Sequence, residues 1–151
     1  MSATIQIRRA TIEQLDELVP LFDGYRQFYQ QASDRPGARR FLAERLLQGE
    51  SIILLAYMAE RAVGFTQLYP LFSSVSMERL WLLNDLFVQP DLRGQGVGEA
   101  LLEQAAALSQ AMGAKGLALE TGVTNQGAQR LYERLGFARE EGSYHYFRPT
   151  R

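Results

Sequence analysis

The sequence lacks cysteine altogether and contains a single histidine, His145, among its 151 residues. Without cysteine the chain can form no disulfide, no thiolate metal site and no cysteine nucleophile. One histidine is too few for a metal site built from histidines, so we expect no metal cofactor.

Long apolar runs and an excess of one charge are also lacking. The chain has 16 Lys and Arg residues against 17 Asp and Glu, a formal net charge of −1. This balance argues against nucleic acid or an anionic membrane as the main partner. No apolar run approaches the roughly 20 residues of a membrane span, and residues 1–5 lack the features of a signal peptide. We therefore expect a cytoplasmic protein.

The residues that are present have the composition of an ordinary globular domain, with 46% hydrophobic and 22% charged residues. A chain of this length typically buries about 70% of its unfolded surface, which is enough for a hydrophobic core. The sequence has no internal repeat, low-complexity tract or linker. We therefore predict one domain over residues 1–151.

Hydrophobic periodicity predicts that strands and helices alternate along the chain, which is typical of the α/β (α+β) class. Thr11, followed by Glu13 and Gln14, predicts a capped helix start, and Pro20 is expected to kink or split that helix. The predicted elements are, in chain order, a strand at 4–10, a helix from Thr11, a loop at 30–37, a short helix before Gly49, strands at 52–58, 63–71 and 80–88, a helix at 96–112, a strand at 116–121, a helix from Asn125, and strands near Phe137 and at 144–147.

Two adjacent polar residues, Asn84 and Asp85, interrupt the apolar strand predicted at 80–88. Burying such groups costs free energy unless they are hydrogen-bonded. They are expected either to face a wet cleft or to pair with the backbone.

A glycine-rich turn, Arg93 to Gly98, lies between that strand and the long helix predicted at 96–112. Its glycines let an anion approach the backbone, and the first N–H groups of the following helix point toward such an anion. We interpret this turn as a cradle for the diphosphate of a nucleotide-like cofactor.

Three kinds of cofactor turn compete for this interpretation. A Walker-type loop is excluded because Val97, Gly98 and Glu99 stand where lysine and serine or threonine are required. The dinucleotide fingerprint needs glycine or alanine where Glu99 or Leu101 stands, but Glu120 lies about where its ribose-binding acid would, so this alternative stays open. The third kind is an acyl-coenzyme A turn.

The turn resembles the pyrophosphate loop of the GNAT superfamily of N-acetyltransferases, Arg/Gln-x-x-Gly-x-Gly/Ala. A later segment is similar to a second motif of that family, through Asn125, Ala128, Leu131-Tyr132 and Leu135-Gly136-Phe137. The region from Phe65 to Val88 looks most like the histone/polyamine/amino-acid acetyltransferase branch. The resemblance implies a mixed central sheet of about 6–7 strands with about four helices, splayed at the central strand.

The resemblance also implies an activity: transfer of acetyl from acetyl-CoA to a primary amine by direct attack in a ternary complex. The acceptor would be a polyamine, an amino acid or a lysine side chain, in a small molecule or a peptide. Similar proteins are commonly homodimers. The alternative is a non-catalytic acyl-CoA-binding sensor or scaffold.

The family's site residues map onto matching positions of this chain. Tyr132 corresponds to the acid that faces the coenzyme sulfur, and a backbone N–H at Leu86 or its neighbours corresponds to the oxyanion donor. The implied coenzyme-binding residues are Leu86, Phe87, Val88, Arg93, Gly94, Gln95, Gly96, Val97, Gly98, Glu99, Asn125, Ala128 and Tyr132.

The general base is less well defined by the sequence. Many relatives have glutamate or histidine where this chain has Asn84, and an amide cannot take a proton at neutral pH. Asp85 is ionisable, but strand alternation turns it to the opposite face unless a bulge intervenes. It would act through water, hold the acceptor's ammonium group or satisfy the strand backbone. Tyr25 and Tyr29 either line the acceptor site or form the edge of an amphipathic helix.

Overall fold

A computed structural model describes residues 4–151 and divides into two compact units, one ending at Glu120 and the other running from Thr121 to Arg151. Residues 1–3 fall within two of the sequence predictions, the single domain over 1–151 and the lack of a signal peptide at 1–5. They lie outside the described residues.

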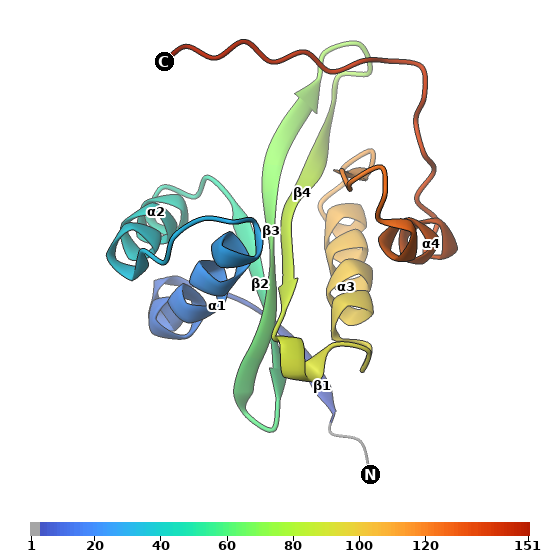
Figure 1. Ribbon diagram of the computed structural model, residues 1–151. Helices are drawn as coiled ribbons and strands as arrows, with labels where there is room; N and C mark the ends of the chain where they lie inside the picture. Colours follow the sequence, from blue (N-terminus) through green and yellow to red (C-terminus); the bar gives the residue numbers. More distant parts are fainter. Residues whose placement is uncertain (1–3) are drawn as a thin grey trace. The chain divides into compact units, whose positions relative to one another are not determined.

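The first unit is built on a five-stranded sheet with the order β1-β2-β3-β4-β5 (Figure 1). Adjacent strands are antiparallel from β1 to β4, and β5 runs parallel to β4, so the sheet is mixed as predicted. The strands are β1 (Ile5–Arg9), β2 (Ile52–Met58), β3 (Arg61–Ser73), β4 (Glu78–Val88) and β5 (Leu117–Leu119).

Helices cover both faces of this sheet. α1 (Leu15–Phe28) and α2 (Arg35–Leu47) lie on one face, and α3 (Val97–Ala111) lies on the other (Figure 1). A short 3-10 turn, η1 (Ile12–Gln14), precedes α1 and has the predicted capping box. In that box Thr11 Oγ1 accepts from Glu13 N at 3.2 Å, and Gln14 Oε1 accepts from Thr11 N at 2.7 Å. α1 continues through Pro20, so the predicted split is absent.

α2 begins earlier than the sequence predicts, inside the expected loop at 30–37. Asp34 caps the helix by accepting a hydrogen bond from Gly37 N at 3.0 Å. Pro36 falls in the first turn, where its missing N–H has no helical partner to lose. The cap and the proline together define a start at Arg35.

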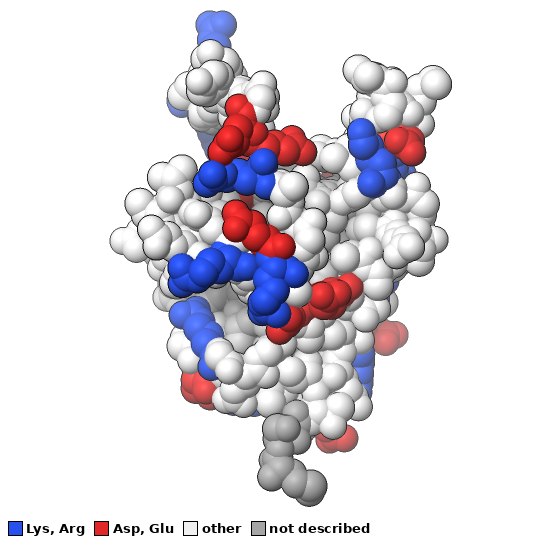
Figure 2. Space-filling view, turned by 90° about the vertical axis from the view of Figure 1, so that its right-hand side faces the viewer, with Lys and Arg blue, Asp and Glu red and all other residues white. Residues whose placement is uncertain are grey.

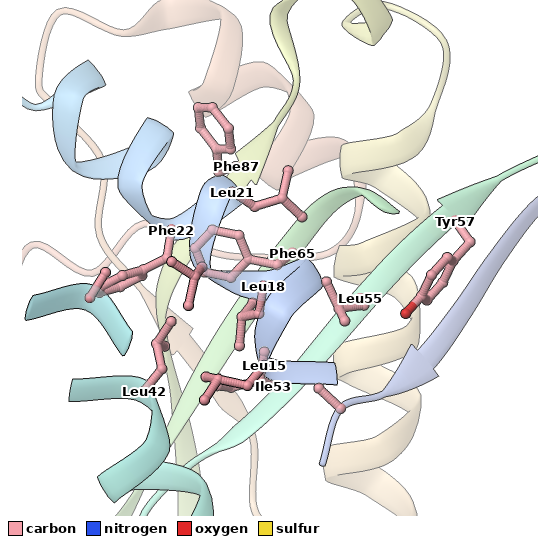
Figure 3. Packing of buried hydrophobic residues seen from close by; sticks show 13 residues of the cluster. Leu15, Leu18, Leu21, Phe22, Leu42, Ile53, Leu55, Tyr57, Phe65 and Phe87 are labelled. Atoms are coloured by element: carbon pink, nitrogen blue, oxygen red, sulfur yellow. The ribbon is translucent and has the colours of Figure 1, made fainter. Parts of the chain in front are cut away.

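The core between the sheet and the first two helices consists of aliphatic and aromatic side chains (Figure 3). Phe22 of α1 stacks on Phe41 of α2, with ring centroids 5.8 Å apart, and meets Phe65 of β3 edge-on at 6.1 Å. On the other face, a Cβ added to Gly64 would lie 3.3 Å from Val97 of α3. Gly64 therefore marks the α3 face of β3, and Phe65 marks the opposite face.

The second unit contains α4 (Gln126–Arg134), which brings the described α-helices to four, as predicted. Asn125 caps α4, because its Oδ1 accepts from Ala128 N at 3.2 Å. Gly136, with φ of 97°, follows the last turn and ends the helix as a C-terminal glycine does.

The strands predicted near Phe137 and at 144–147 are wrong for the described structure, whose sheet has five strands and not six or seven. Aromatic alternation supplies a suitable pattern, but a strand forms only when its N–H and C=O groups pair with a neighbouring strand. These residues form no such ladder, and Tyr144 and Tyr146 are 89% and 93% exposed.

Candidate active site

A β-bulge in β4 determines which way the predicted polar pair faces. Gln67 pairs with Asp85, whereas the next β3 residue, Leu68, pairs with Leu83, so Asn84 is the extra residue on β4. Cross-strand partners share a face of the sheet. Asp85 therefore shares the face of Gln67 and Phe65, under α1 and α2, while Leu83 shares the α3 face. The sequence analysis required such a bulge if Asp85 was to face the same side as the expected acceptor site.

The carboxylate of Asp85 is held by two amide donors. Gln67 Nε2 donates to Oδ2 and Asn84 Nδ2 donates to Oδ1, each at 2.6 Å. Asp85 is 2% exposed, whereas Asn84 is exposed. Gln67 is itself fully buried, and its Oε1 accepts from Ser51 Oγ at 2.8 Å. The Asp85 carboxylate thus lies between the buried amide of Gln67 and the exposed side chain of Asn84.

Burial controls the proton affinity of this carboxyl group. It raises the pKa of Asp85, although hydrogen bonds from Asn84, Gln67 and Tyr25 partly stabilise the charged form. Burial also raises the pKa of Tyr25, and the nearby charge of Asp85 raises it further. The same two causes raise the pKa of Tyr69 to about 12. Both tyrosine hydroxyls therefore remain protonated at neutral pH, so neither can act as a base, and Asp85 is the carboxyl among these three groups.

The end of α1 brings the predicted acceptor-lining tyrosines to this cluster. Tyr25 donates its hydroxyl to Asn84 O at 3.3 Å, and its ring meets Phe65 at 5.7 Å. Tyr29 lies edge-on to Tyr25 at 5.1 Å and is 60% exposed. Tyr25 is thus both an apolar wall and a polar neighbour of the bulge, and Tyr29 lies at the solvent side.

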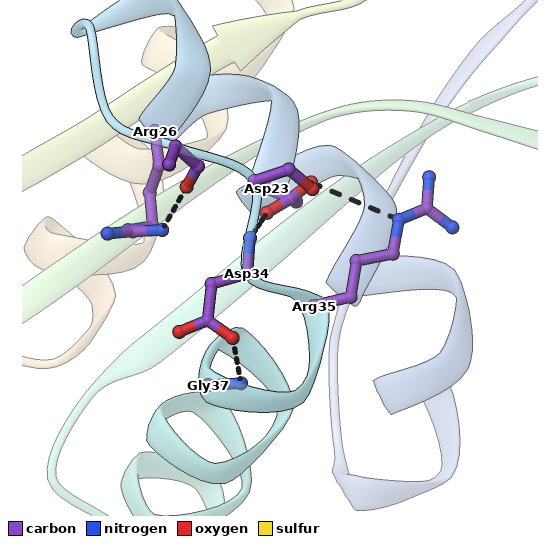
Figure 4. Close-up of polar contacts among 7 residues, drawn as sticks. Asp23, Arg26, Asp34, Arg35 and Gly37 are labelled. Carbon is purple, nitrogen blue, oxygen red and sulfur yellow. Dashed lines mark hydrogen bonds and ion pairs between the residues drawn. The ribbon is translucent and has the colours of Figure 1, made fainter.

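Buried Asp23 anchors the connection from α1 to α2 (Figure 4). It accepts from Ser33 Oγ at 2.7 Å and from Asp34 N at 2.8 Å, and Arg35 Nε lies 3.9 Å away. Burial raises its pKa, but these hydrogen bonds and the positive charges of Arg35 and Arg26 outweigh burial, so the pKa is lowered. The ionised carboxylate ties the loop to the helix end that carries Tyr25.

The end of β4 has an open side. β5 pairs with β4 only at residues 81–83. Gln89 N donates to Val63 O at 2.8 Å, and hydrogen-bonded pairs recur at every second residue of an antiparallel ladder. The main-chain groups of Phe87 therefore point to β3, and those of Leu86 and Val88 point to the opposite, open side.

The glycine turn after β4 is a backbone cradle. Gly94 and Gly96 have φ of 78° and 86°, a region that side chains rarely adopt, and a Cβ at either would have no atom within 4 Å. α3 starts after Gly96 with no side chain capping it. The open space and the helix start fit an anion such as a coenzyme diphosphate.

Arg93, at the start of this turn, already has partners within the chain. Its Nε donates to Val88 O at 3.1 Å, and its guanidinium lies over the rings of Phe28 and Phe87 at 5.3 and 5.6 Å. Of the remaining predicted residues, Gln95 precedes Gly96, and the first turn of α3 contains Val97, Gly98 and Glu99. The Val97 side chain is buried.

The other predicted coenzyme and acid residues lie in the second unit. Tyr132 is half-buried on α4, and its ring meets Phe137 edge-on at 6.0 Å. Asn125 is the helix cap, as its spacing predicts, and Ala128 supplies the capped N–H. Each of these residues therefore has a defined place on or next to α4.

The sequence analysis did not identify three residues of the polar cluster around the Asp85 carboxyl: Ser51, Gln67 and Tyr69. The signal that singled out Asn84 and Asp85 was a polar residue inside an apolar strand. Gln67 carries the same signal, since it lies between Phe65 and Leu68. Ser51, just before β2, gives no such signal because its position is also that of an ordinary turn residue.

Two further features concern residues 4–151, the part of the chain that the structure describes. No group of three or more His, Cys, Asp or Glu side chains there could hold a metal ion. Within the same residues no helix has the length and apolar character to cross a membrane. On the face in Figure 2, basic and acidic side chains lie next to one another.

Comparison with known proteins identifies close relatives. The acetyltransferase (GNAT) family matches residues 18–137. YhfO of Bacillus subtilis, named as an uncharacterized N-acetyltransferase, is 47% identical over 94% of this chain and 95% of its own length. The crystal structure of a probable acetyltransferase is 40% identical and has a TM-score of 0.91, covering 97% of this chain and 98% of its own. An aminoglycoside N-acetyltransferase in complex with CoA shares the fold at 19% identity, with a TM-score of 0.80 over 98% and 97% of the two chains.

Proposed function

The chain belongs to the acetyltransferase (GNAT) family and is an acyltransferase, and on this premise we propose that it acetylates a primary amine with acetyl-CoA in a ternary complex. The acceptor is a polyamine, an amino acid or a lysine side chain, as in the histone/polyamine/amino-acid branch. The observation that carries the proposal is the bulge at Asn84, because it turns the Asp85 carboxylate toward Tyr25.

In this proposal the backbone of the glycine turn binds the coenzyme diphosphate. The left-handed φ angles at Gly94 and Gly96 and the free space beside them support this role. The outward main-chain groups of Leu86 and Val88 pair with the pantetheine arm, as an added strand would. When bound, acetyl-CoA supplies an acetyl group activated as a thioester. By the resemblance of their motif, Asn125, Ala128 and Tyr132 also bind the coenzyme.

The acceptor must lose a proton before it can react. A protonated alkylamine has a pKa near 10.4 and no lone pair for attack. Asp85 takes this proton through a water molecule that the exposed amide of Asn84 orients. The raised pKa of the Asp85 carboxyl makes it a better proton acceptor than a solvated aspartate. Tyr25 and Tyr29 line the path of the amine's alkyl chain.

The neutral nitrogen then attacks the thioester carbonyl carbon, and the carbonyl oxygen becomes negative. The N–H of Leu86 donates to this oxyanion. As the C–S bond breaks, Tyr132 gives its proton to the departing thiolate. The second proton of the attacking nitrogen restores the Tyr132 hydroxyl. The products are the amide and free CoA thiol, and one proton is released through Asp85.

The experiment incubates the chain with acetyl-CoA and a panel of amines, namely spermidine, free amino acids and a lysine peptide. Free thiol is followed over time and acetylated products are identified by mass. Thiol release that requires one class of amine supports the proposal and names the acceptor. Tight coenzyme binding with no thiol release from any amine would instead indicate an acyl-CoA sensor or scaffold.

We also propose that residues 1–151 act as one acetyltransferase domain in a cytoplasmic homodimer. The family match at residues 18–137 extends across both compact units, which supports a single functional domain. The dimer follows from the family resemblance alone. Light scattering of the purified chain tests it, and a monomer at all concentrations would contradict it.

A further inference from the structure

Two buried polar side chains behind Asp85 have no part in the mechanism above. Gln67 is 0% exposed on β3, and Ser51 is 8% exposed at the start of β2. Ser51 Oγ donates to Gln67 Oε1 at 2.8 Å, and Gln67 Nε2 donates to Asp85 Oδ2 at 2.6 Å. Polar groups this deep in a sheet destabilise the fold unless they are paired, so their arrangement needs a physical reason.

The ionised Asp85 carboxylate and the Ser51 hydroxyl together orient the Gln67 amide. A side-chain amide has a donor end and an acceptor end, and here the acceptor end is occupied by the serine hydroxyl. The donor end is therefore aimed at the carboxylate. This orientation stabilises the ionised form of Asp85.

The same pair can also satisfy the protonated form. If the amide turns by 180°, Gln67 Oε1 accepts from the Asp85 hydroxyl, and Gln67 Nε2 donates to Ser51 Oγ, which is an acceptor as well as a donor. Each of the three side chains keeps at least one hydrogen bond in both states. An apolar side chain at position 67 would leave the buried carboxyl with one partner fewer in each state.

Three other side chains surround the Asp85 carboxyl. Tyr25 of α1 and Tyr69 of β3 face the carboxyl, and both keep their protons at neutral pH. The charged neighbours of Tyr69 are Arg45 of α2 and Glu50, which pair with each other at 3.1 Å. Asn84 donates to Oδ1 from the solvent side.

We propose that Gln67, oriented by Ser51, is a positioning residue that keeps the Asp85 carboxyl hydrogen-bonded both before and after it accepts the proton of the amine. This inference rests on the proposed role of Asp85 as proton acceptor, and it adds a pair of residues that act through Asp85 without touching the substrate.

The direct test is a titration of the Asp85 carboxyl carbon by NMR in the full chain without coenzyme. The parent is compared with Gln67→Met, which keeps the volume but removes the amide, and with Ser51→Ala. We expect the carboxyl to titrate at higher pH in Gln67→Met, because Gln67 binds the charged carboxylate more strongly than the neutral carboxyl. In Ser51→Ala we expect a smaller shift in the same direction. If Gln67→Met fails to fold, Ser51→Ala decides the question.

Two control variants remove buried hydrogen bonds that do not reach the carboxyl. Thr66→Val loses the bond from Thr66 Oγ1 to Asp85 O, and Ser109→Ala loses the bond from Ser109 Oγ to Ala105 O within α3. We expect both to lower stability without moving the titration. A carboxyl that titrates in Gln67→Met as it does in the parent would overturn the inference.

Kinetics separate this inference from the function on which it rests. The acid limb of kcat/KM should move to higher pH in Gln67→Met together with the carboxyl titration, and kcat should fall about tenfold, the usual effect of losing a hydrogen bond to a charged group. If the carboxyl shifts while the acid limb stays, the positioning role holds and Asp85 is not the proton acceptor. If neither shifts, the positioning role is wrong.

Discussion

Gln67 and Asp85 lie opposite each other on β3 and β4, with Gln67 Nε2 2.6 Å from Asp85 Oδ2. They meet because β4 has an extra residue, Asn84, between Asp85 and Leu83, whereas their partners on β3 are adjacent. Without the extra residue, strand alternation would turn Asp85 toward α3. A local irregularity of the backbone therefore decides on which face of the sheet an ionisable group can work.

The charge on Asp85 should destabilise the fold at neutral pH. Its pKa is raised in the folded chain, so the folded state holds the proton more tightly than the unfolded state. The protonated carboxyl therefore stabilises the fold. Its contribution to the free energy of unfolding is complete below the unfolded pKa of 3.8 and is lost as pH rises through the folded pKa. We expect Asp85→Asn to be more stable than the parent at pH 7, with the difference shrinking as pH falls from the raised folded pKa toward 3.8. Urea unfolding across this range measures it; a variant less stable at every pH would contradict it.

Removal of the Tyr132 hydroxyl should affect chemistry more than binding. We expect Tyr132→Phe to lower kcat about a hundredfold, the usual scale for a lost general acid, with coenzyme affinity unchanged. Tyr144→Phe, at a tyrosine that is 89% exposed, is the matched control. Single-turnover thiol release and calorimetric titration with CoA give the two quantities. Equal turnover in Tyr132→Phe and the parent would remove Tyr132 from the acid role.

A side chain at Gly96 should obstruct the coenzyme cradle. Gly96 and Gly113 have similar φ angles, 86° and 74°, and neither has an atom within 4 Å of an added Cβ. Leucine at either position should therefore cost about 1–2 kcal/mol of backbone strain. We expect Gly96→Leu to bind CoA much more weakly, and Gly113→Leu to bind it as the parent does. Equal CoA affinity in the two variants, measured by equilibrium dialysis, would argue against the cradle.

The anchor at Asp23 should stabilise the fold in a pH-dependent way. Loss of its hydrogen bonds from Ser33 and Asp34 in Asp23→Ala should lower the free energy of unfolding by about 2 kcal/mol at pH 7. Exposed Arg35 adds little. The pKa of Asp23 is lowered on folding, so its contribution is present above pH 3.8 and is lost as pH falls through the folded pKa.

Denaturant unfolding at pH 7 and pH 3 checks this expectation for Asp23. Asp16→Ala is the control, because Asp16 lies on the same helix and its side chain is 86% exposed in its ion pair with Arg39. We expect little change from the control at either pH. A loss in Asp23→Ala as large at pH 3 as at pH 7 would mean that packing, and not charge, is responsible.

Local signals in the sequence were sufficient for most of the first unit. The Thr11 capping box, the run of strands from Ile52 to Val88 and the glycines that precede α3 each have a cause within a few residues. Such signals act within one turn or one hairpin, so periodicity and turn chemistry can locate them. The same locality explains why Asn125 was identified as a cap.

Features that depend on a distant partner could not be predicted in this way. The bulge at Asn84 depends on the register with β3, and no residue type in β4 specifies it. Ser51 joins the cluster only because β2 brings it beside Gln67. The aromatic residues at 144–147 have a strand pattern, but whether they form a strand depends on a neighbour that the pattern does not reveal.

No side chain caps the start of α3. An anion bound there would take the place of the missing capping side chain, so coenzyme binding and folding should be thermodynamically linked. Saturation at a hundred times the dissociation constant would add about 2.7 kcal/mol to the stability. The melting temperature and resistance to proteolysis should then rise with acetyl-CoA concentration, and the abundance of the enzyme in a cell would follow the supply of its own acetyl donor.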